Sequence, residues 1–133
     1  MERKLSTVFA LDVVGYSKLM ADDEARTLSN LKIRREFIDS LIKEFGGRIF
    51  NTAGDSVMAE FASPVKAVEC SVQIQNRSQS INTKADSKDQ MNFRIGINVG
   101  DVMVSEDNLF GDAINIAARL EAEANMDGIC ISQ

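Results

Sequence analysis

Residues 8–17, VFALDVVGYS, and residues 51–61, NTAGDSVMAEF, decide the fold of this chain. Each is an apolar, strand-like run that contains one aspartate, Asp12 in the first and Asp55 in the second. A carboxylate in a buried strand is costly unless something neutralises its charge. Each aspartate also lies close to a glycine, where the backbone can approach a phosphate group closely. The two stretches therefore predict neighbouring strands that bring two acidic side chains to one binding site.

The sequence contains no histidine, which excludes imidazole acid–base chemistry and the usual zinc sites. Two carboxylates without histidine suit a hard cation that prefers oxygen ligands, such as Mg²⁺ or Mn²⁺. Two such ions could activate a hydroxyl group and hold a polyphosphate. The residues therefore predict a metal-dependent nucleotide site.

The composition is that of one globular domain, expected over residues 1–133, with 44% hydrophobic and 26% charged residues. A formal net charge of −5 argues against a nucleic-acid partner, because phosphate binding at that scale needs a basic face. We expect no signal peptide and no membrane span, since no apolar run is long enough. Cys70 and Cys130 are expected to be reduced thiols, so the predicted location is the cytoplasm.

The first half of the chain predicts a strand, a helix and a hairpin. Apolar residues 7–14 predict a central strand, and Ser17 is expected to cap a helix that ends at Gly46 and Gly47. Residues 48–51 and 56–61 predict two strands around a tight turn. The next helix is expected to begin at Ser63-Pro64 and to bury Val65, Val68 and Val72.

The second half continues the alternation of strands and helices. We expect a loop over residues 82–90, a half-buried strand over 91–99, a break at Gly100-Asp101, a short strand over 102–104, a helix over 112–124 and a strand over 129–132. The order predicts an α+β fold: a ferredoxin-like βαββαβ core with an additional αβ unit, a mixed and mostly antiparallel sheet, and helices on one face.

Two further groups of residues could bind a nucleotide. Gly15-Tyr16-Ser17 follows the first strand at a helix N-terminus, where backbone N–H groups favour a phosphate. Asn115 and Arg119 lie four residues apart on one predicted helix face, and an amide and a guanidinium there suit a ribose or phosphoryl oxygen.

Each group has a simpler interpretation when it is taken alone. Asp12 could be a strand-end turn former or the aspartate of a phospho-accepting receiver domain, although the other acidic residues and the lysine of a receiver are missing. Gly54-Asp55 is a common hairpin turn. Asn115 and Arg119 could be a solvated helix face, with Glu121 and Glu123 near enough to neutralise the arginine. The prediction depends on all these groups occurring together.

Four segments in order, FALDVVGYS, GGRIFNTAGDSVMAEF, FRIGINVGDV and LFGDAINIAARLEAEA, closely resemble the catalytic domain of class III nucleotidyl (adenylate/guanylate) cyclases. The resemblance covers about residues 8–132. This family is similar to polymerase palm domains in fold and in its use of two metal ions for catalysis. The resemblance implies an enzyme that converts a nucleoside triphosphate to a 3′,5′-cyclic nucleotide and pyrophosphate at a homodimer interface, in intracellular signalling.

The resemblance also implies a role for each candidate residue. It assigns metal binding to Asp12, the carbonyl of Val13 and Asp55, triphosphate binding to the backbone of Gly15, Tyr16 and Ser17, ribose orientation to Asn115, and transition-state stabilisation to Arg119. The aspartates of one chain would face Asn115 and Arg119 of the other, so a monomer should be inactive.

The chain departs from the family pattern in three places. Asn51 and Asn108 stand at the two positions that read the purine, where adenylate cyclases usually have lysine and either aspartate or threonine. An amide both donates and accepts, so ATP and GTP both remain possible, as does a pyrimidine nucleotide. Family frequency favours ATP. The third departure is that the sequence given stops at Gln133, before the closing elements and the triphosphate-binding lysine that the family pattern leads one to expect. The alternative function is therefore a weak or inactive cyclase-like module that binds nucleotide or dimerises to regulate an attached domain.

Overall fold

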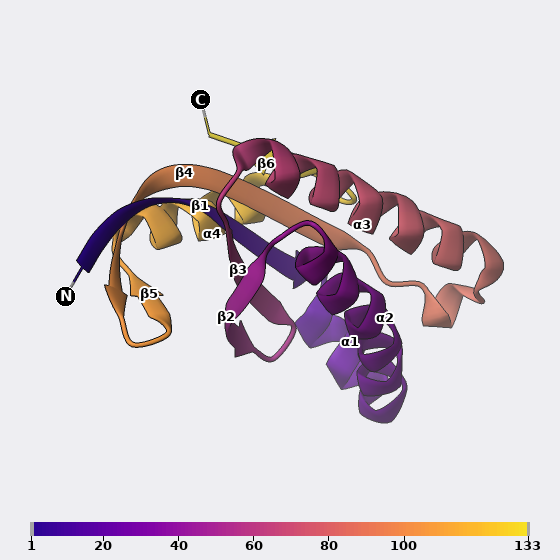
Figure 1. The fold of residues 1–133 in the computed structure, drawn as a ribbon. Helices are drawn as coiled ribbons and strands as arrows, with labels where there is room; N and C mark the ends of the chain where they lie inside the picture. Colours follow the sequence, from indigo (N-terminus) through magenta and orange to yellow (C-terminus); the bar gives the residue numbers. More distant parts are fainter. Residues whose placement is uncertain (1, 133) are drawn as a thin grey trace.

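The computed structural model describes residues 2–132, which form one sheet with helices on both of its faces (Figure 1). The strands are β1 (Glu2–Val13), β2 (Arg48–Ala53), β3 (Ser56–Phe61), β4 (Phe93–Ser105), β5 (Asn108–Phe110) and β6 (Ile129–Ile131). The helices are α1 (Tyr16–Asp22), α2 (Glu24–Glu44), α3 (Pro64–Lys84) and α4 (Asp112–Glu123), with a short 3₁₀ helix η1 (Ser87–Asp89). No helix within residues 2–132 combines the length and the apolar character needed to cross a membrane.

The sheet confirms the predicted α+β class with mixed, mostly antiparallel pairing. Its strand order is β2-β3-β1-β4-β5, and β6 joins β4 as the one parallel pair among residues 2–132. The central strand β1 pairs with β4 from Glu2 to Val13, and its other edge pairs with β3 over residues 7–11. Asp12 therefore lies near the end of a strand that has neighbours on both sides.

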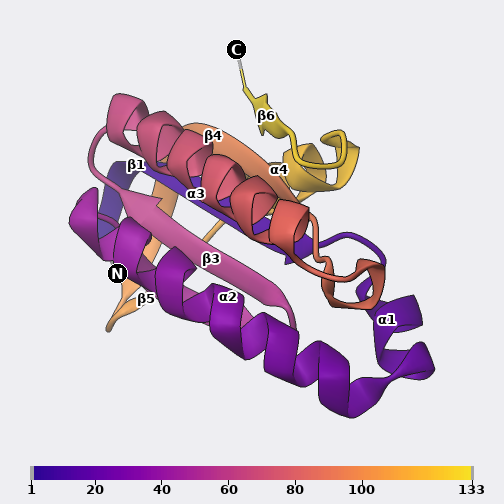
Figure 2. The same cartoon turned by 90° about the vertical axis from the view of Figure 1, so that its right-hand side faces the viewer.

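The two faces of β1 are buried by different helices. Phe9, Leu11 and Val13 belong to the larger apolar cluster, which α2 and α3 cover side by side (Figure 2). Val8 and Ala10 point to the opposite face and pack in a smaller cluster with α4. The expectation that the helices share one face holds for α2 and α3 but is wrong for α4.

A glycine explains the position of α4. A Cβ atom on Gly96 of β4 would lie 2.8 Å from the Cα atom of Glu121 and closer still to other backbone atoms of α4. The helix therefore packs directly on the strand backbone, a contact that any other residue would prevent. Ala113 and Ala117 lie on the same side of α4 and are buried against the sheet, where their small side chains also allow close packing.

The predicted first helix is two helices. Gly15, with φ of 66°, takes the N-cap position of α1, so the expectation that Ser17 caps the helix is wrong. The chain breaks at Asp23, whose side chain accepts a hydrogen bond from the Arg26 N–H and caps α2. The predicted end at Gly46 is confirmed, where φ is 81°.

Ser63 caps α3 as predicted, by accepting a hydrogen bond from the N–H of Lys66. Of the three valines expected to be buried in α3, Val68 packs against the larger apolar cluster, but Val65 is 67% exposed and Val72 is 42% exposed. The buried residues of α3 are Ala67, Cys70, Ser71, Ile74, Gln75 and Ser78. Small residues therefore face the sheet and allow α3 to pack closely on it.

The second half differs from prediction in the length of α3, in the continuity of β4 and in the additional strand β5, which was not expected. Helix α3 extends to Lys84, so it occupies the first residues of the expected loop. Strand β4 continues through Gly100-Asp101, because β1 supplies pairing partners along this whole stretch. The helix expected over residues 112–124 and the last strand are confirmed.

Candidate active site

The two predicted metal-binding aspartates are brought together at one end of β1. The β2–β3 hairpin turns at Gly54-Asp55, where Gly54 has φ of 57°. In this turn Oδ2 of Asp55 accepts a hydrogen bond of 2.9 Å from the N–H of Val13. Asp12 is adjacent to Val13, so the hydrogen bond fixes the hairpin tip beside the first aspartate.

The segment after β1 lies at the same end of the sheet. Gly15 and Ser17 are exposed, and Tyr16 is half-buried. A Cβ atom on Gly54 would lie 3.9 Å from Cε2 of Tyr16, so the tyrosine ring borders the hairpin turn. The backbone of residues 15–17 is therefore available to a ligand held beside the aspartates.

Two further charged side chains lie beside Asp12. Arg94 is directly opposite Asp12 in the β1–β4 pair, and its Nε atom is 3.5 Å from Oδ1 of Asp12. Glu121 of α4 reaches the same guanidinium, with Oε2 3.7 Å from Nε of Arg94. Within residues 2–132, these three atoms are shielded from solvent and have no hydrogen-bond partner while both carboxyl groups are charged.

Sequence reasoning missed the role of Arg94 and misplaced Glu121. Residues two apart on a helix point in different directions, so Glu121 faces the sheet while Arg119 is exposed. The simpler interpretation, in which Glu121 helps to neutralise Arg119, is therefore wrong for Glu121. A signal was present, because Glu121 follows Ala113 and Ala117 at a spacing of four residues and so belongs to their buried stripe.

Burial and the surrounding acids change the titration of this cluster. Burial raises the pKa of Asp12, and the charge of Asp55 acts in the same direction. Burial and the neighbouring Asp12 carboxylate raise the pKa of Glu121 to about 8. A side-chain hydrogen bond between Glu121 and Asp12, which forms when one of the two is protonated, lowers the pKa of Asp12 and raises the pKa of Glu121, and the charge of Arg94 lowers both. Glu121 is therefore largely protonated at neutral pH and shares its proton with Asp12.

These residues fit a hard divalent cation. Oδ1 of Asp12 accepts no hydrogen bond from an N–H group within residues 2–132, and one oxygen of Asp55 is held by the Val13 N–H. Carboxylate oxygens are the ligands that Mg²⁺ and Mn²⁺ prefer. No group of three or more His, Cys, Asp and Glu side chains able to hold a metal occurs within residues 2–132. Water or substrate oxygens would therefore complete the coordination.

Asn115 and Arg119 are not brought to the aspartates within one chain. Each follows a sheet-facing alanine of α4 by two residues, which rotates it by about 200° around the helix. Both side chains are exposed, and no hydrogen bond or ion pair within residues 2–132 joins them to Asp12 or Asp55. They are free to contact a second molecule.

The two predicted base-reading residues lie on neighbouring elements. Asn51 is exposed on β2, just after an irregularity in the β2–β3 register, and Asn108 is exposed at the start of β5. Arg48 joins the two hairpins, because it contacts Glu60 at 2.9 Å and donates to the carbonyl of Asp107 at 2.7 Å. The structure therefore holds β2 and β5 in contact.

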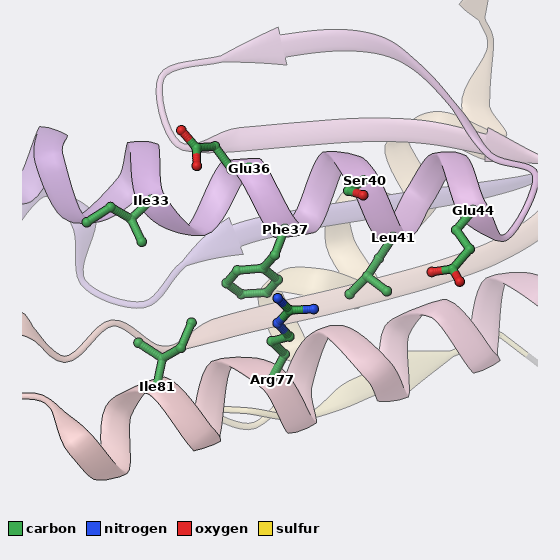
Figure 3. Close-up of a pocket in the computed structure, with 8 residues that line it drawn as sticks. All are labelled: Ile33, Glu36, Phe37, Ser40, Leu41, Glu44, Arg77 and Ile81. Atoms are coloured by element: carbon green, nitrogen blue, oxygen red, sulfur yellow. The ribbon is translucent and has the colours of Figure 1, made fainter.

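A depression lies between α2 and α3, on the face of the sheet opposite to α4 (Figure 3). Its centre is formed by Phe37 and Arg77, whose guanidinium carbon is 5.6 Å from the centre of the phenyl ring. Glu36 and Glu44 lie along the α2 side. The sheet separates this depression from Arg94 and Glu121, so it is not part of the aspartate site.

Comparison with known proteins gives a match over nearly the whole chain. Residues 2–133 match the family model described as the adenylate and guanylate cyclase catalytic domain. A Rhizobium meliloti protein named "Putative adenylate cyclase 3" is 41% identical over 133 residues. The match covers 99% of this chain but 23% of that protein, so the chain spans about a quarter of its length.

Solved structures give the same result. A protein from Silicibacter pomeroyi described as an adenylate/guanylate cyclase/hydrolase superimposes with a TM-score of 0.91 and 41% identity, covering 99% of this chain and 77% of that one. A dimeric guanylyl cyclase domain from Blastocladiella emersonii, described as non-canonical, has a TM-score of 0.84 at 23% identity, covering 100% of this chain and 82% of that one. At 23% identity, the match to the Blastocladiella emersonii domain shows similarity of fold alone.

Proposed function

Because the chain belongs to the adenylate and guanylate cyclase catalytic domain family, we propose that it forms a homodimer and converts a nucleoside triphosphate, preferentially ATP, to the 3′,5′-cyclic nucleotide and pyrophosphate. The observation that carries this proposal is the hydrogen bond from the Val13 N–H to Asp55. It brings a carboxylate of β1 and a carboxylate of the β2–β3 turn to one end of the sheet, where a triphosphate and its cations could bind. Residues 1–133 would act as one catalytic module.

Each candidate residue has a defined task in this reaction. Asp12, Asp55 and the carbonyl of Val13 would hold two Mg²⁺ or Mn²⁺ ions. When bound, these cations would supply the positive charge that activates the ribose 3′-hydroxyl and neutralises the leaving pyrophosphate. The backbone of Gly15, Tyr16 and Ser17 would donate hydrogen bonds to the triphosphate.

A second copy of the chain would complete the site. Asn115 and Arg119 are exposed and point away from the sheet that carries the aspartates. We infer that Asn115 of one protomer orients the ribose bound at the aspartates of the other. Arg119 would stabilise the charge that develops on the α-phosphate during attack by the 3′-hydroxyl. Each homodimer would then contain two equivalent sites.

Base selection would depend on Asn51 and Asn108. Both side chains are exposed, and the contact between β2 and β5 supports a shared base-binding edge. An amide can satisfy either purine, because it has both a donor and an acceptor. The preference for ATP is inferred from the relative named as an adenylate cyclase.

The first experiment is a turnover assay with Mn²⁺ and, in parallel, ATP, GTP, CTP and UTP, with separate detection of cyclic products and pyrophosphate. The expected result is cyclic AMP, with a specific activity that rises with protein concentration as the dimer forms. Nucleotide binding without a cyclic product would support the alternative, a module that regulates an attached domain.

Mixed dimers test the shared site directly. Neither Asp12→Ala nor the double variant Asn115→Ala/Arg119→Ala should be active alone. A mixture of the two should regain activity, because one site per mixed dimer combines an intact aspartate half with an intact Asn115 and Arg119 half. Failure of this mixture, with both variants folded and dimeric, would contradict the proposed arrangement.

A further inference from the structure

The two residues proposed to read the base lie on strands at opposite ends of the sheet. Asn51 is on β2 and Asn108 begins β5, and three strands separate β2 from β5 in the order β2-β3-β1-β4-β5. Strand pairing alone therefore does not determine the distance between the two asparagines. The hairpin that carries Asn108 is also short, because three residue pairs join β5 to β4. Such a hairpin has little stability of its own, so another contact is needed to hold it beside β2.

Arg48 supplies this contact. It stands at the start of β2, directly opposite Glu60 in the β2–β3 pair. Its Nε atom lies 2.9 Å from Oε1 of Glu60, and its Nη1 atom donates a hydrogen bond of 2.7 Å to the carbonyl of Asp107. Asp107 is 59 positions away in the sequence and is next to Asn108. One guanidinium therefore connects the two ends of the sheet, where β5 lies toward β2 (Figure 1).

Glu60 is held in place from a second side. Its Oε2 atom lies 2.9 Å from Nζ of Lys4 on β1, and its side chain is only 14% exposed. Burial would raise the pKa of Glu60, but the hydrogen bonds from Lys4 and Arg48 outweigh burial and lower this pKa below the ordinary value of 4.5. A carboxylate fixed by two cations restricts its partners more than an isolated surface ion pair does. Arg48 is therefore held in the orientation that reaches Asp107.

From this geometry we propose that Arg48 is a positioning residue for the base: together with Glu60 it fixes the β4–β5 hairpin against β2, and so sets the spacing between Asn108 and Asn51. The inference rests on the proposed function, since it takes the two asparagines as the residues that contact the base. Arg48 and the turn at Asp55 lie at opposite ends of the β2–β3 hairpin. Loss of Arg48 should therefore disturb the base and leave the triphosphate and its cations bound.

Calorimetric binding of two probes to the full chain, with Mn²⁺ present, tests the inference without turnover. The first probe is an ATP analogue whose α–β bridging oxygen is replaced by a methylene group, so that pyrophosphate cannot leave. The second is inorganic triphosphate, which has no base. Arg48→Met should weaken binding of the analogue about tenfold, the effect of one charge-assisted hydrogen bond, and leave binding of triphosphate unchanged. Arg35→Met removes an arginine–carboxylate pair on α2 and is the matched control, which should bind both probes as the wild type does.

Amide hydrogen exchange of the free protein gives a second measurement of the positioning role. Exchange over residues 105–110 should be faster in Arg48→Met than in the wild type, while the β1–β4 pair should exchange as before. Glu60→Gln should change both measurements in the same direction, and it should have no further effect in the Arg48→Met background if it acts through the arginine. A further loss of analogue affinity in that background would overturn the inference, as would unchanged exchange over residues 105–110 in Arg48→Met.

The remaining outcomes separate this inference from the proposed function. Circular dichroism and urea unfolding check that each variant is folded, and Arg48→Gln replaces Arg48→Met if the latter is not. Equal weakening of both probes by Arg48→Met, or an unchanged affinity for the analogue, would overturn the inference alone. Absence of binding of either probe to the wild-type chain would overturn the proposed function as well.

Discussion

Replacement of Gly96 by alanine should displace α4 from the sheet. The added Cβ atom would lie 2.8 Å from the Cα atom of Glu121, and closer to the backbone of the same helical turn. Carbon atoms in contact prefer a separation of about 3.5–4.0 Å, so the helix must move by about 1 Å. Backbone atoms cannot rotate away as the end of a side chain can, so α4 must move as a unit.

The displacement can be converted into a stability change. Overpacking of a well-packed interior costs about 1–3 kcal/mol, and a backbone collision belongs at the upper end of that range. For a chain of this size, a loss of about 3 kcal/mol lowers the Tm by about 10 °C. Turnover should fall by about 100-fold, because α4 carries Asn115 and Arg119 and a 1 Å misplacement of catalytic groups has an effect of this size.

Urea unfolding and the turnover assay should be run on Gly96→Ala together with Gly46→Ala as the control. Gly46 also has a demanding backbone, with φ of 81°, but a Cβ atom there would meet nothing within 4 Å. The control should lose about 1–2 kcal/mol through backbone strain and keep its activity. If Gly96→Ala is as stable and as active as the wild type, the close packing of α4 on β4 is refuted.

Three further predictions concern other parts of the molecule. Asp12→Asn should lower Mn²⁺-dependent turnover by about 10²–10³-fold. A thermal melt should show no loss of stability, because burial raises the pKa of this carboxyl group and so disfavours its charged form. Unchanged turnover would exclude a metal role for Asp12. Asn51→Lys combined with Asn108→Asp should raise the ratio of kcat/KM for ATP over GTP about tenfold, equivalent to about 1.4 kcal/mol, and an unchanged ratio would remove both residues from the base site. Asp89 accepts hydrogen bonds from Arg26 at 2.6 and 2.9 Å, and these hold the pKa of Asp89 below the ordinary value of 3.8. The contribution of this pair to stability should be present at pH 5 and decline as the pH falls below about 4. The urea midpoints of the wild type and Asp89→Asn should therefore converge at low pH, and a constant difference between them would contradict this.

Local chemistry made parts of the fold predictable from the sequence. The hairpin at Gly54-Asp55 and the start of α3 at Ser63-Pro64 depend on residues that are neighbours in the chain. The same reasoning proposed Asp12, Asp55, residues 15–17, Asn115 and Arg119, and the resemblance to a known family added Val13, Asn51 and Asn108 and gave each residue its expected role. The structure brings Asp12 and Asp55 together as their strand positions suggested.

Features that depend on distant residues were not predictable in the same way. In α3, a stripe through Val65 and Val72 and a stripe through Cys70 and Ile74 have the same helical period, and only packing against the sheet selects the second. The position of α4 is determined by Gly96, which the sequence shows only as one residue of an alternating strand. Arg94 and Glu121 are 27 positions apart, and their contact exists only because α4 crosses β4 at this glycine.

The central position of β1 has a consequence for synthesis on the ribosome. Its first partner, β3, becomes available when residue 61 has emerged, but the partner of its other edge begins only at residue 93. At roughly 5–20 residues per second, translation of the intervening segment takes roughly 2–6 seconds. During that time the edge that includes Phe9 and Leu11 remains unpaired and open to association with other nascent chains. A slow translation step between α3 and β4 would therefore be expected to lower the yield of folded protein, even with the amino-acid sequence unchanged.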